Sequence, residues 1–299
     1  MSTEHLSRIP GLARPYLRAG LGALPLSRRP QTLPDRQLVL PGVIVDRGHL
    51  AEYSRVCGFG VTDALPGTYP HVLSFPLQLR LMSSRTFPFP LLGLVHVANR
   101  IEVTRDVRAD EPLTVTVRAA NLRPHERGHQ VELVTEMDVA GERVWASTST
   151  YLHRSGGSST GGSSTGGAGT GGARSGTERG TVEPGALWHL DGGLGRRYAA
   201  VSGDRNPIHL HPLTARAFGF PRAIAHGMWT AARCLAALQG RLPAAYVQQV
   251  SFRRPVLLPG TVAFTAEHVG GGWALELRDA RRGTPHLSGN VSPAPGTTS

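Results

Sequence analysis

Apolar residues recur at helical spacing in one stretch of the C-terminal part of the chain and then alternate at strand spacing. The helical stretch has one apolar face, formed by Met228, Ala231, Ala232, Leu235 and Leu238. Gly240 follows it as a stop signal, so the pattern predicts a buried helix over 228–238. The alternating stretches predict strands over 246–254, 261–269 and 273–278, separated by Pro-Gly and Gly-Gly turns.

The N-terminal part shows the same order of elements. A short helix and a loop come first, and a longer apolar segment follows. Alternation then predicts strands over 94–103, 113–119, 130–139 and 144–152. One helix followed by a run of antiparallel strands is an α+β arrangement, in which the sheet wraps around the helix. The chain is therefore predicted to contain two such units.

A Gly/Ser-rich stretch separates the two units. Residues 155–178 are nearly all Gly, Ser, Thr and Ala, and have too little apolar surface to offset the entropy of ordering. We therefore predict a leader at 1–37 that is partly disordered, a first arm at 38–153, a flexible linker at 154–179 and a second arm at 180–299.

The two arms resemble each other in two short segments. Tyr53–Gly58 matches Tyr198–Gly203 at an offset of 145 residues, and Ile101–Val107 matches Val250–Val256 at an offset of 149. Matches at nearly constant offset indicate an internal repeat. The arms are therefore interpreted as distant copies of one unit.

The amino-acid composition indicates which classes of molecule the protein could bind. All 32 basic residues are arginine and the formal net charge is +11, so the surface attracts anions such as coenzyme A phosphates or an acidic carrier protein. Aromatic residues make up 6% and are not interleaved with arginines, which argues against nucleic acid.

Cysteine usage and hydropathy bear on the compartment. Cys57 and Cys234 lie far apart and outside any CxxC motif, which suits a reducing cytoplasm. No apolar run approaches the ~20 residues of a membrane-spanning helix. The apolar piece at 19–26 is not followed by a cleavage pattern, so we expect no signal peptide and a cytoplasmic protein.

The segment SGDRNPIH at 202–209 contains the chemistry of greatest interest. Asp204 and His209 would point about 140° apart on a continuous helix, but Pro207 forces a turn that can bring them together. Asn206 can hold that turn through its side chain. A carboxylate and an imidazole around one water form a general acid/base pair. The alternative is a capping Asp204 and a core histidine, and the downstream sequence argues against it.

His226 and Gly227 stand where the predicted buried helix begins. Free backbone N–H groups and the positive end of the helix dipole lie at such a position. The Gly227 N–H could therefore polarise a thioester oxygen as negative charge develops. An acid/base pair together with such a donor is suited to proton transfer alpha to a carbonyl.

The run YAAVSGDRNPIHLHPLTARAFGFPRAIAHGMWTAA at 198–232 closely resembles the MaoC-like (R)-specific enoyl-CoA hydratases, also called hydratase 2, and the (3R)-hydroxyacyl-ACP dehydratases. VSFRRPVLLPG at 250–260 extends the resemblance loosely. It implies a hotdog fold and reversible addition of water to a trans-2-enoyl thioester, giving a (3R)-3-hydroxyacyl thioester in fatty acid metabolism. The substrate is carried on coenzyme A or on an acyl carrier protein. No metal or redox cofactor is implied.

The same resemblance assigns roles to residues. It implies that Asp204 and His209 activate the water and handle the protons, that Asn206 supports them, and that Gly227 supplies the oxyanion N–H. We further expect a group of neighbours to bind substrate, with the two arginines pairing with phosphates. These are Ser202, Ile224, His226, Met228, Arg253 and Arg254.

The first arm lacks the acid/base pair. At the offset of 145, Phe59 takes the place of Asp204 and Ala64 that of His209. This resembles the double-hotdog arrangement, in which a degenerate copy packs against a catalytic one and mimics a dimer. The first arm then either widens the acyl groove or serves as scaffold alone, and further association of two chains is left open.

Three alternatives accompany this prediction. A zinc site of His209, His211 and His226 is disfavoured, because His209 is already assigned to catalysis and no carboxylate or thiolate is evident as a further ligand. A hotdog acyl thioesterase would release free thiol. A non-catalytic acyl-thioester binding module would bind the substrate without turnover.

Overall fold

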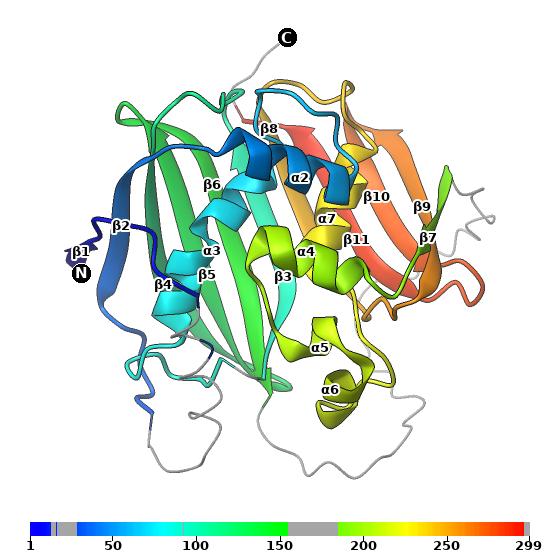
Figure 1. Ribbon diagram of the computed structural model, residues 1–299, viewed down its shortest axis with the longest axis horizontal. Coiled ribbons are helices and arrows are strands. Elements are labelled where there is room, and N and C mark those ends of the chain that lie inside the picture. Colours follow the sequence, from blue (N-terminus) through cyan, green and yellow to red (C-terminus); the bar gives the residue numbers. More distant parts are fainter. Residues whose placement is uncertain (13–15, 17–28, 92, 155–184, 296–299) are drawn as a thin grey trace.

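The computed structural model describes residues 1–12, 16, 29–91, 93–154 and 185–295 (Figure 1). Within these residues, eleven strands form one sheet in the order β1-β2-β4-β5-β6-β3-β8-β11-β10-β9-β7. The strands are β1 (Ser2–His5), β2 (Arg36–Val43), β3 (Leu94–Val103), β4 (Leu113–His125), β5 (Gly128–Val139), β6 (Glu142–Arg154), β7 (Ala186–Leu190), β8 (Tyr246–Phe252), β9 (Gly260–Val269), β10 (Gly272–Asp279) and β11 (Pro285–Pro293). The helices are α2 (Arg47–Cys57), α3 (Tyr69–Met82), α4 (Leu194–Ser202), α5 (Pro207–Leu210), α6 (Pro212–Ala217) and α7 (Gly227–Ala236).

The strand order is symmetric about the pair β3 and β8. The N-terminal half has the order β2-β4-β5-β6-β3, and the C-terminal half has the reverse order of equivalents, β8-β11-β10-β9-β7. In the antiparallel pairing of β3 with β8, Arg100 lies opposite Gln249. These two residues are counterparts at the 149-residue offset, since 249 − 100 = 149. A residue that pairs with its own counterpart marks a pseudo-two-fold axis, as in an isologous dimer interface.

Each half of the sheet curves around one helix, α3 in the N-terminal half and α7 in the C-terminal half (Figure 1). The two halves share one hydrophobic core. Hydrogen bonds also join them, because Trp229 Nε1 donates to the Val56 carbonyl at 2.9 Å and His49 Nε2 lies 2.8 Å from the Val201 carbonyl. The predicted α+β double hotdog is confirmed.

The long elements follow the hydrophobic pattern closely. β3 has the predicted bounds, and α7 begins one residue earlier and ends two residues earlier than the predicted helix. β4 extends to His125, well beyond the predicted end at 119, because the apolar alternation fades while the ladder with β5 continues. The edge strands β1 and β7 and the inner strands β2 and β11 were not predicted. β11 is interrupted by Ser288, Gly289 and Asn290, which hide its pattern.

The predicted leader and linker are described only in part. Ser2–His5 of the leader forms β1, which pairs in parallel with β2. Of the predicted linker, Arg154 ends β6 and the rest lies outside the described residues. Among the described helices, none is long and apolar enough to cross a bilayer. Cys57 and Cys234 are buried and unpaired.

Candidate active site

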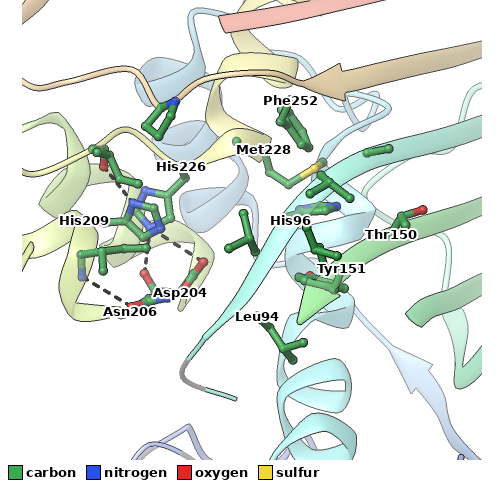
Figure 2. Close-up of a pocket in the computed structure, with 18 of the residues that line it drawn as sticks. Leu94, His96, Thr150, Tyr151, Asp204, Asn206, His209, His226, Met228 and Phe252 are labelled. Atoms are coloured by element: carbon green, nitrogen blue, oxygen red, sulfur yellow. Dashed lines mark hydrogen bonds and ion pairs between the residues drawn. The ribbon is translucent and has the colours of Figure 1, made fainter. Parts of the chain in front are cut away.

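The segment from α4 to α7 forms one wall of a cavity of about 970 Å³ that is lined by both halves of the molecule. α4 ends at Gly203, whose φ of +74° is left-handed and favours glycine. The chain then leaves the helix at Asp204, and α5 begins at Pro207 with Asn206 as its N-cap. The predicted turn therefore exists, and Asp204, Asn206 and His209 all line the cavity (Figure 2).

Asn206 holds the turn from both ends. Its side-chain oxygen lies 3.4 Å from the Ile208 N–H, and its own N–H donates to Asp204 Oδ1 at 3.1 Å. These are the contacts of an Asx turn followed by an N-cap. The main-chain N–H of Asn206 therefore fixes the direction of the Asp204 carboxylate.

His209 is buried, and its Nδ1 donates to the Ile224 carbonyl at 2.8 Å. This bond places the proton on Nδ1, so Nε2 carries a lone pair. Burial lowers the pKa of His209, although the Asp204 charge and the Ile224 carbonyl oppose the shift. At neutral pH the ring is therefore uncharged and can accept a proton.

The Asp204 carboxylate is held in its ionised form. Burial alone would raise its pKa, but His226, His209, the Asn206 N–H and the Tyr16 hydroxyl together hold it below its ordinary value. Among the described residues no donor bonds Oδ2, which lies 4.0 Å from His226 Nε2. The side chain is 31% exposed, so Oδ2 is available to a bound molecule.

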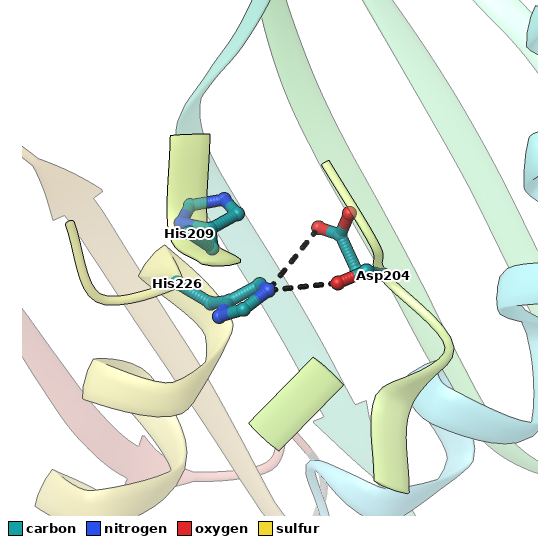
Figure 3. Close-up of side chains that lie close together, drawn as sticks. All are labelled: Asp204, His209 and His226. Carbon is teal, nitrogen blue, oxygen red and sulfur yellow. Dashed lines mark hydrogen bonds and ion pairs between the residues drawn. The ribbon is translucent and has the colours of Figure 1, made fainter. Parts of the chain in front are cut away.

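His226 contacts both members of the pair. Its Nε2 donates to the Asp204 carbonyl at 3.0 Å (Figure 3). Its ring stacks on His209 with centroids 3.7 Å apart and packs against Tyr198 at 4.9 Å. Burial lowers the pKa of His226 to about 3, so it is neutral. It thus contacts both Asp204 and His209 at once.

Gly227 begins α7 beside the cavity, as predicted. The first N–H groups of a helix have no partner within the helix. A Cβ at this position would lie 3.2 Å from the Phe252 ring, so glycine leaves room that a larger residue would fill. The Gly227 N–H and the positive end of α7 are therefore placed to stabilise negative charge in the cavity.

The remaining predicted residues also line the cavity. Ser202 Oγ accepts from the Asp204 N–H at 3.2 Å, and the Ile224 carbonyl orients His209. Met228 is buried beside Gly227. Arg253 and Arg254 are exposed cavity-lining residues, and Arg253 Nε donates to Ser288 Oγ at 3.0 Å.

His211 does not join the other histidines. Its Nδ1 accepts from the Leu213 N–H at 3.2 Å as the N-cap of α6, and the residue is exposed. Of the described residues, Asp204, His209 and His226 form the group that could hold a metal ion, with ligand atoms within 4.8 Å of one another. His209 Nδ1 and His226 Nε2 already donate to carbonyl oxygens, so each ring has one nitrogen left that could bind a metal ion. That no cofactor is needed remains an expectation.

Three residues at the site were missed by the sequence analysis. The Tyr16 hydroxyl accepts from the Arg205 N–H at 2.7 Å and lies 3.3 Å from Asp204 Oδ1, yet Tyr16 stands in the Arg/Pro-rich leader. His71 and His96 reach the cavity from the N-terminal half. No local motif marks any of them, because each approaches the site through the fold.

Comparisons with known proteins identify the family of this chain. Residues 194–288 match the MaoC like domain family. The chain is 38% identical over 275 residues to 3-hydroxyacyl-thioester dehydratase X of Mycobacterium tuberculosis, covering 92% of this chain and 95% of that protein. Over 74 residues, 23% of this chain and 47% of the relative, it is 42% identical to a 3-hydroxybutyryl-CoA dehydratase of Methylorubrum extorquens.

Solved structures agree with the fold. The crystal structure of HtdX from Mycobacterium tuberculosis superposes with a TM-score of 0.75 at 36% identity, covering 87% of this chain and all of that one. A MaoC-like dehydratase of Phytophthora capsici has a TM-score of 0.68 at 18% identity, covering 88% and 96%. Fold and site together define a double-hotdog protein with its site in the second copy. The chain belongs to the MaoC-like dehydratase family.

Proposed function

We propose that this protein is a hydro-lyase that interconverts trans-2-enoyl thioesters and (3R)-3-hydroxyacyl thioesters. The observation that carries the proposal is the convergence of an ionised Asp204 and a neutral His209 on one cavity wall beside the N-terminus of α7. The names of the relatives, a 3-hydroxyacyl-thioester dehydratase and a 3-hydroxybutyryl-CoA dehydratase, support the same reaction class.

In the hydration direction, a water between Asp204 and His209 adds its oxygen to C3 of the enoyl thioester. The acid/base pair takes the proton that the water loses and returns a proton to C2, so that one water is added in total. The Gly227 N–H stabilises the charge that forms on the thioester oxygen between the two steps. The Asn206 N–H holds the Asp204 carboxylate in place, and His226 Nε2 holds the Asp204 main-chain carbonyl.

The carrier of the acyl group is proposed from the cavity rim. Arg253 and Arg254 are cations suited to the phosphates of coenzyme A or of phosphopantetheine. The net charge of +11 also favours an acidic carrier protein. Such thioesters, and two unpaired buried cysteines, fit a cytoplasmic enzyme.

The test is an assay of trans-2-enoyl-CoA hydration with the product identified. We expect the wild type to form (3R)-3-hydroxyacyl-CoA without releasing thiol, and Asp204→Asn or His209→Ala to reduce kcat by ~10²-fold or more. Asp63→Asn, an exposed carboxylate of the N-terminal half that pairs with Arg47, is the matched control and should keep full activity. Thiol release, or full activity in both active-site variants, would refute the proposal.

A further inference from the structure

Two histidines of the N-terminal half line the same cavity as Asp204 and His209. His71 lies on the first turn of α3 and His96 on β3. Figure 2 shows His96 across the cavity from the acid/base pair, beside Tyr151. Both imidazoles thus line the cavity into which the Asp204 carboxylate also faces. The proposed reaction uses neither of them.

Aromatic neighbours hold His96 in place. Its ring stacks on Tyr151, its cross-strand neighbour on β6, with centroids 4.6 Å apart. Phe252 of the C-terminal half packs edge-on at 5.0 Å, and the His71 ring is stacked at 6.1 Å. The imidazole pair is therefore a fixed part of the cavity wall.

Both rings have hydrogen-bonding capacity that the protein does not fill. His71 Nδ1 and His96 Nε2 have no partner in the described part of the chain. Burial lowers the pKa of His71 to about 4 and that of His96 to about 3, so both rings are neutral at pH 7, with one donor and one acceptor each. Buried polar groups in proteins normally have a hydrogen-bond partner. These two nitrogens are therefore candidates to bind a polar group of a ligand.

The cavity beyond the two histidines is apolar. One face of α3 carries His71, Phe75, Leu79 and Met82 along the cavity, at spacings of four, four and three residues. A rise of about 1.5 Å per residue gives about 16 Å from His71 to Met82. An acyl chain that lies along this face would therefore have the imidazole pair at one end of it.

We propose that His71 and His96 recognise an oxygen substituent, a hydroxyl or a keto group, on the acyl chain a few carbons beyond C3. This inference rests on the proposed function, because it takes the cavity to hold an acyl thioester. The substituent supplies the missing hydrogen-bond partner, whereas a plain alkyl chain leaves His71 Nδ1 and His96 Nε2 unpaired. The preferred substrates are then thioesters of oxygenated acyl chains.

The test measures binding separately from turnover. Saturated acyl-CoA thioesters of equal length, either plain or with a hydroxyl at C5, C6 or C7, are titrated calorimetrically into the wild type. We expect Kd to be about tenfold lower for one hydroxylated isomer than for the plain chain. Equal Kd values for all of them would overturn the inference and mean that the imidazoles hold water only.

Variants assign the preference to the two residues. His96→Phe and His71→Leu should each abolish the preference, while His268→Phe, at an exposed histidine on β9, should retain it. A preference that survives in both cavity variants would overturn the assignment. The wild-type comparison decides the question by itself if either variant fails to fold. Discrimination in binding without hydration of any enoyl-CoA would refute the proposed function and leave this inference standing.

Discussion

The two halves of the molecule contain equivalent turns, after α2 and after α4, but the residue that follows the glycine differs. α2 and α4 both end at a glycine in the left-handed region, Gly58 with φ +82° and Gly203 with φ +74°. The next residue is Phe59 in the N-terminal half and Asp204 in the C-terminal half. Phe59 is buried and stacks on Tyr53 with centroids 6.3 Å apart, whereas Asp204 faces the cavity. The turn is therefore common to both halves, whereas the carboxylate is found in the C-terminal half alone.

The helices opposite these turns differ in a corresponding way. α3 presents Phe75 and Leu79 to the cavity that Asp204 also lines. α7 instead places the Arg233 guanidinium against Gly58 and 4.4 Å over the Trp188 ring, and Gln239 beyond it accepts from the Gly60 N–H at 2.6 Å. Protein side chains thus fill the space in one half that a substrate would fill in the other.

Of the changes that distinguish the two turns, replacing Phe59 should have the largest effect on the free energy of unfolding. Phe59→Ala removes a buried ring and is expected to lower the free energy of unfolding by about 3 kcal/mol. Hydration activity per folded molecule should stay near the wild-type value, because the residue lies outside the cavity. Denaturant unfolding and turnover measured on the same samples test this. A loss of turnover as large as that of Asp204→Asn would show that the N-terminal turn is functional.

Acid should destabilise both halves through their buried histidines. Burial lowers the pKa of His226 to about 3 and of His71 to about 4, from an ordinary value of 6.5. Below pH 6.5 the unfolded chain therefore binds more protons than the folded one, and the free energy of unfolding falls as the pH falls.

Each of these two histidines should contribute a loss of about 1.6 kcal/mol between pH 6.5 and pH 5. The lowered pKa of Asp204 adds a loss of the same sign at lower pH. Denaturant unfolding between pH 7 and pH 4 measures the slope, and His71→Leu should make it shallower. An unchanged slope in that variant would contradict the prediction.

Tyr16→Phe should have the smallest effect. The hydroxyl helps to lower the pKa of Asp204, so its loss should raise that pKa and move the acid limb of the kcat/KM profile to higher pH. We expect a loss of less than about tenfold in kcat/KM at neutral pH, in line with the loss of one hydrogen bond to a charged group. The measurement is the pH profile of both proteins, and superimposable profiles would exclude contact in solution between Tyr16 and the carboxylate.

The sequence predicted those features of the site that depend on residues close together in the chain. Pro207 and Asn206 imposed a turn whose geometry could be predicted, and the apolar period of 228–238 located α7 and hence Gly227. Tyr16, His71 and His96 could not be predicted, because their approach to Asp204 depends on how the leader and the N-terminal half pack. The contacts of His226 with Asp204 and His209 are likewise tertiary, and no local pattern in the sequence could predict them.

The central claim, that Asp204 and His209 act together on one water, is tested most directly by a double-mutant cycle on kcat for enoyl-CoA hydration. Groups that act as a unit are strongly non-additive. The Asp204→Asn/His209→Ala double variant should therefore be about as impaired as the worse single variant. Multiplied losses, with the double variant slower by the product of the two single effects, would mean that the two residues work independently and would contradict the account.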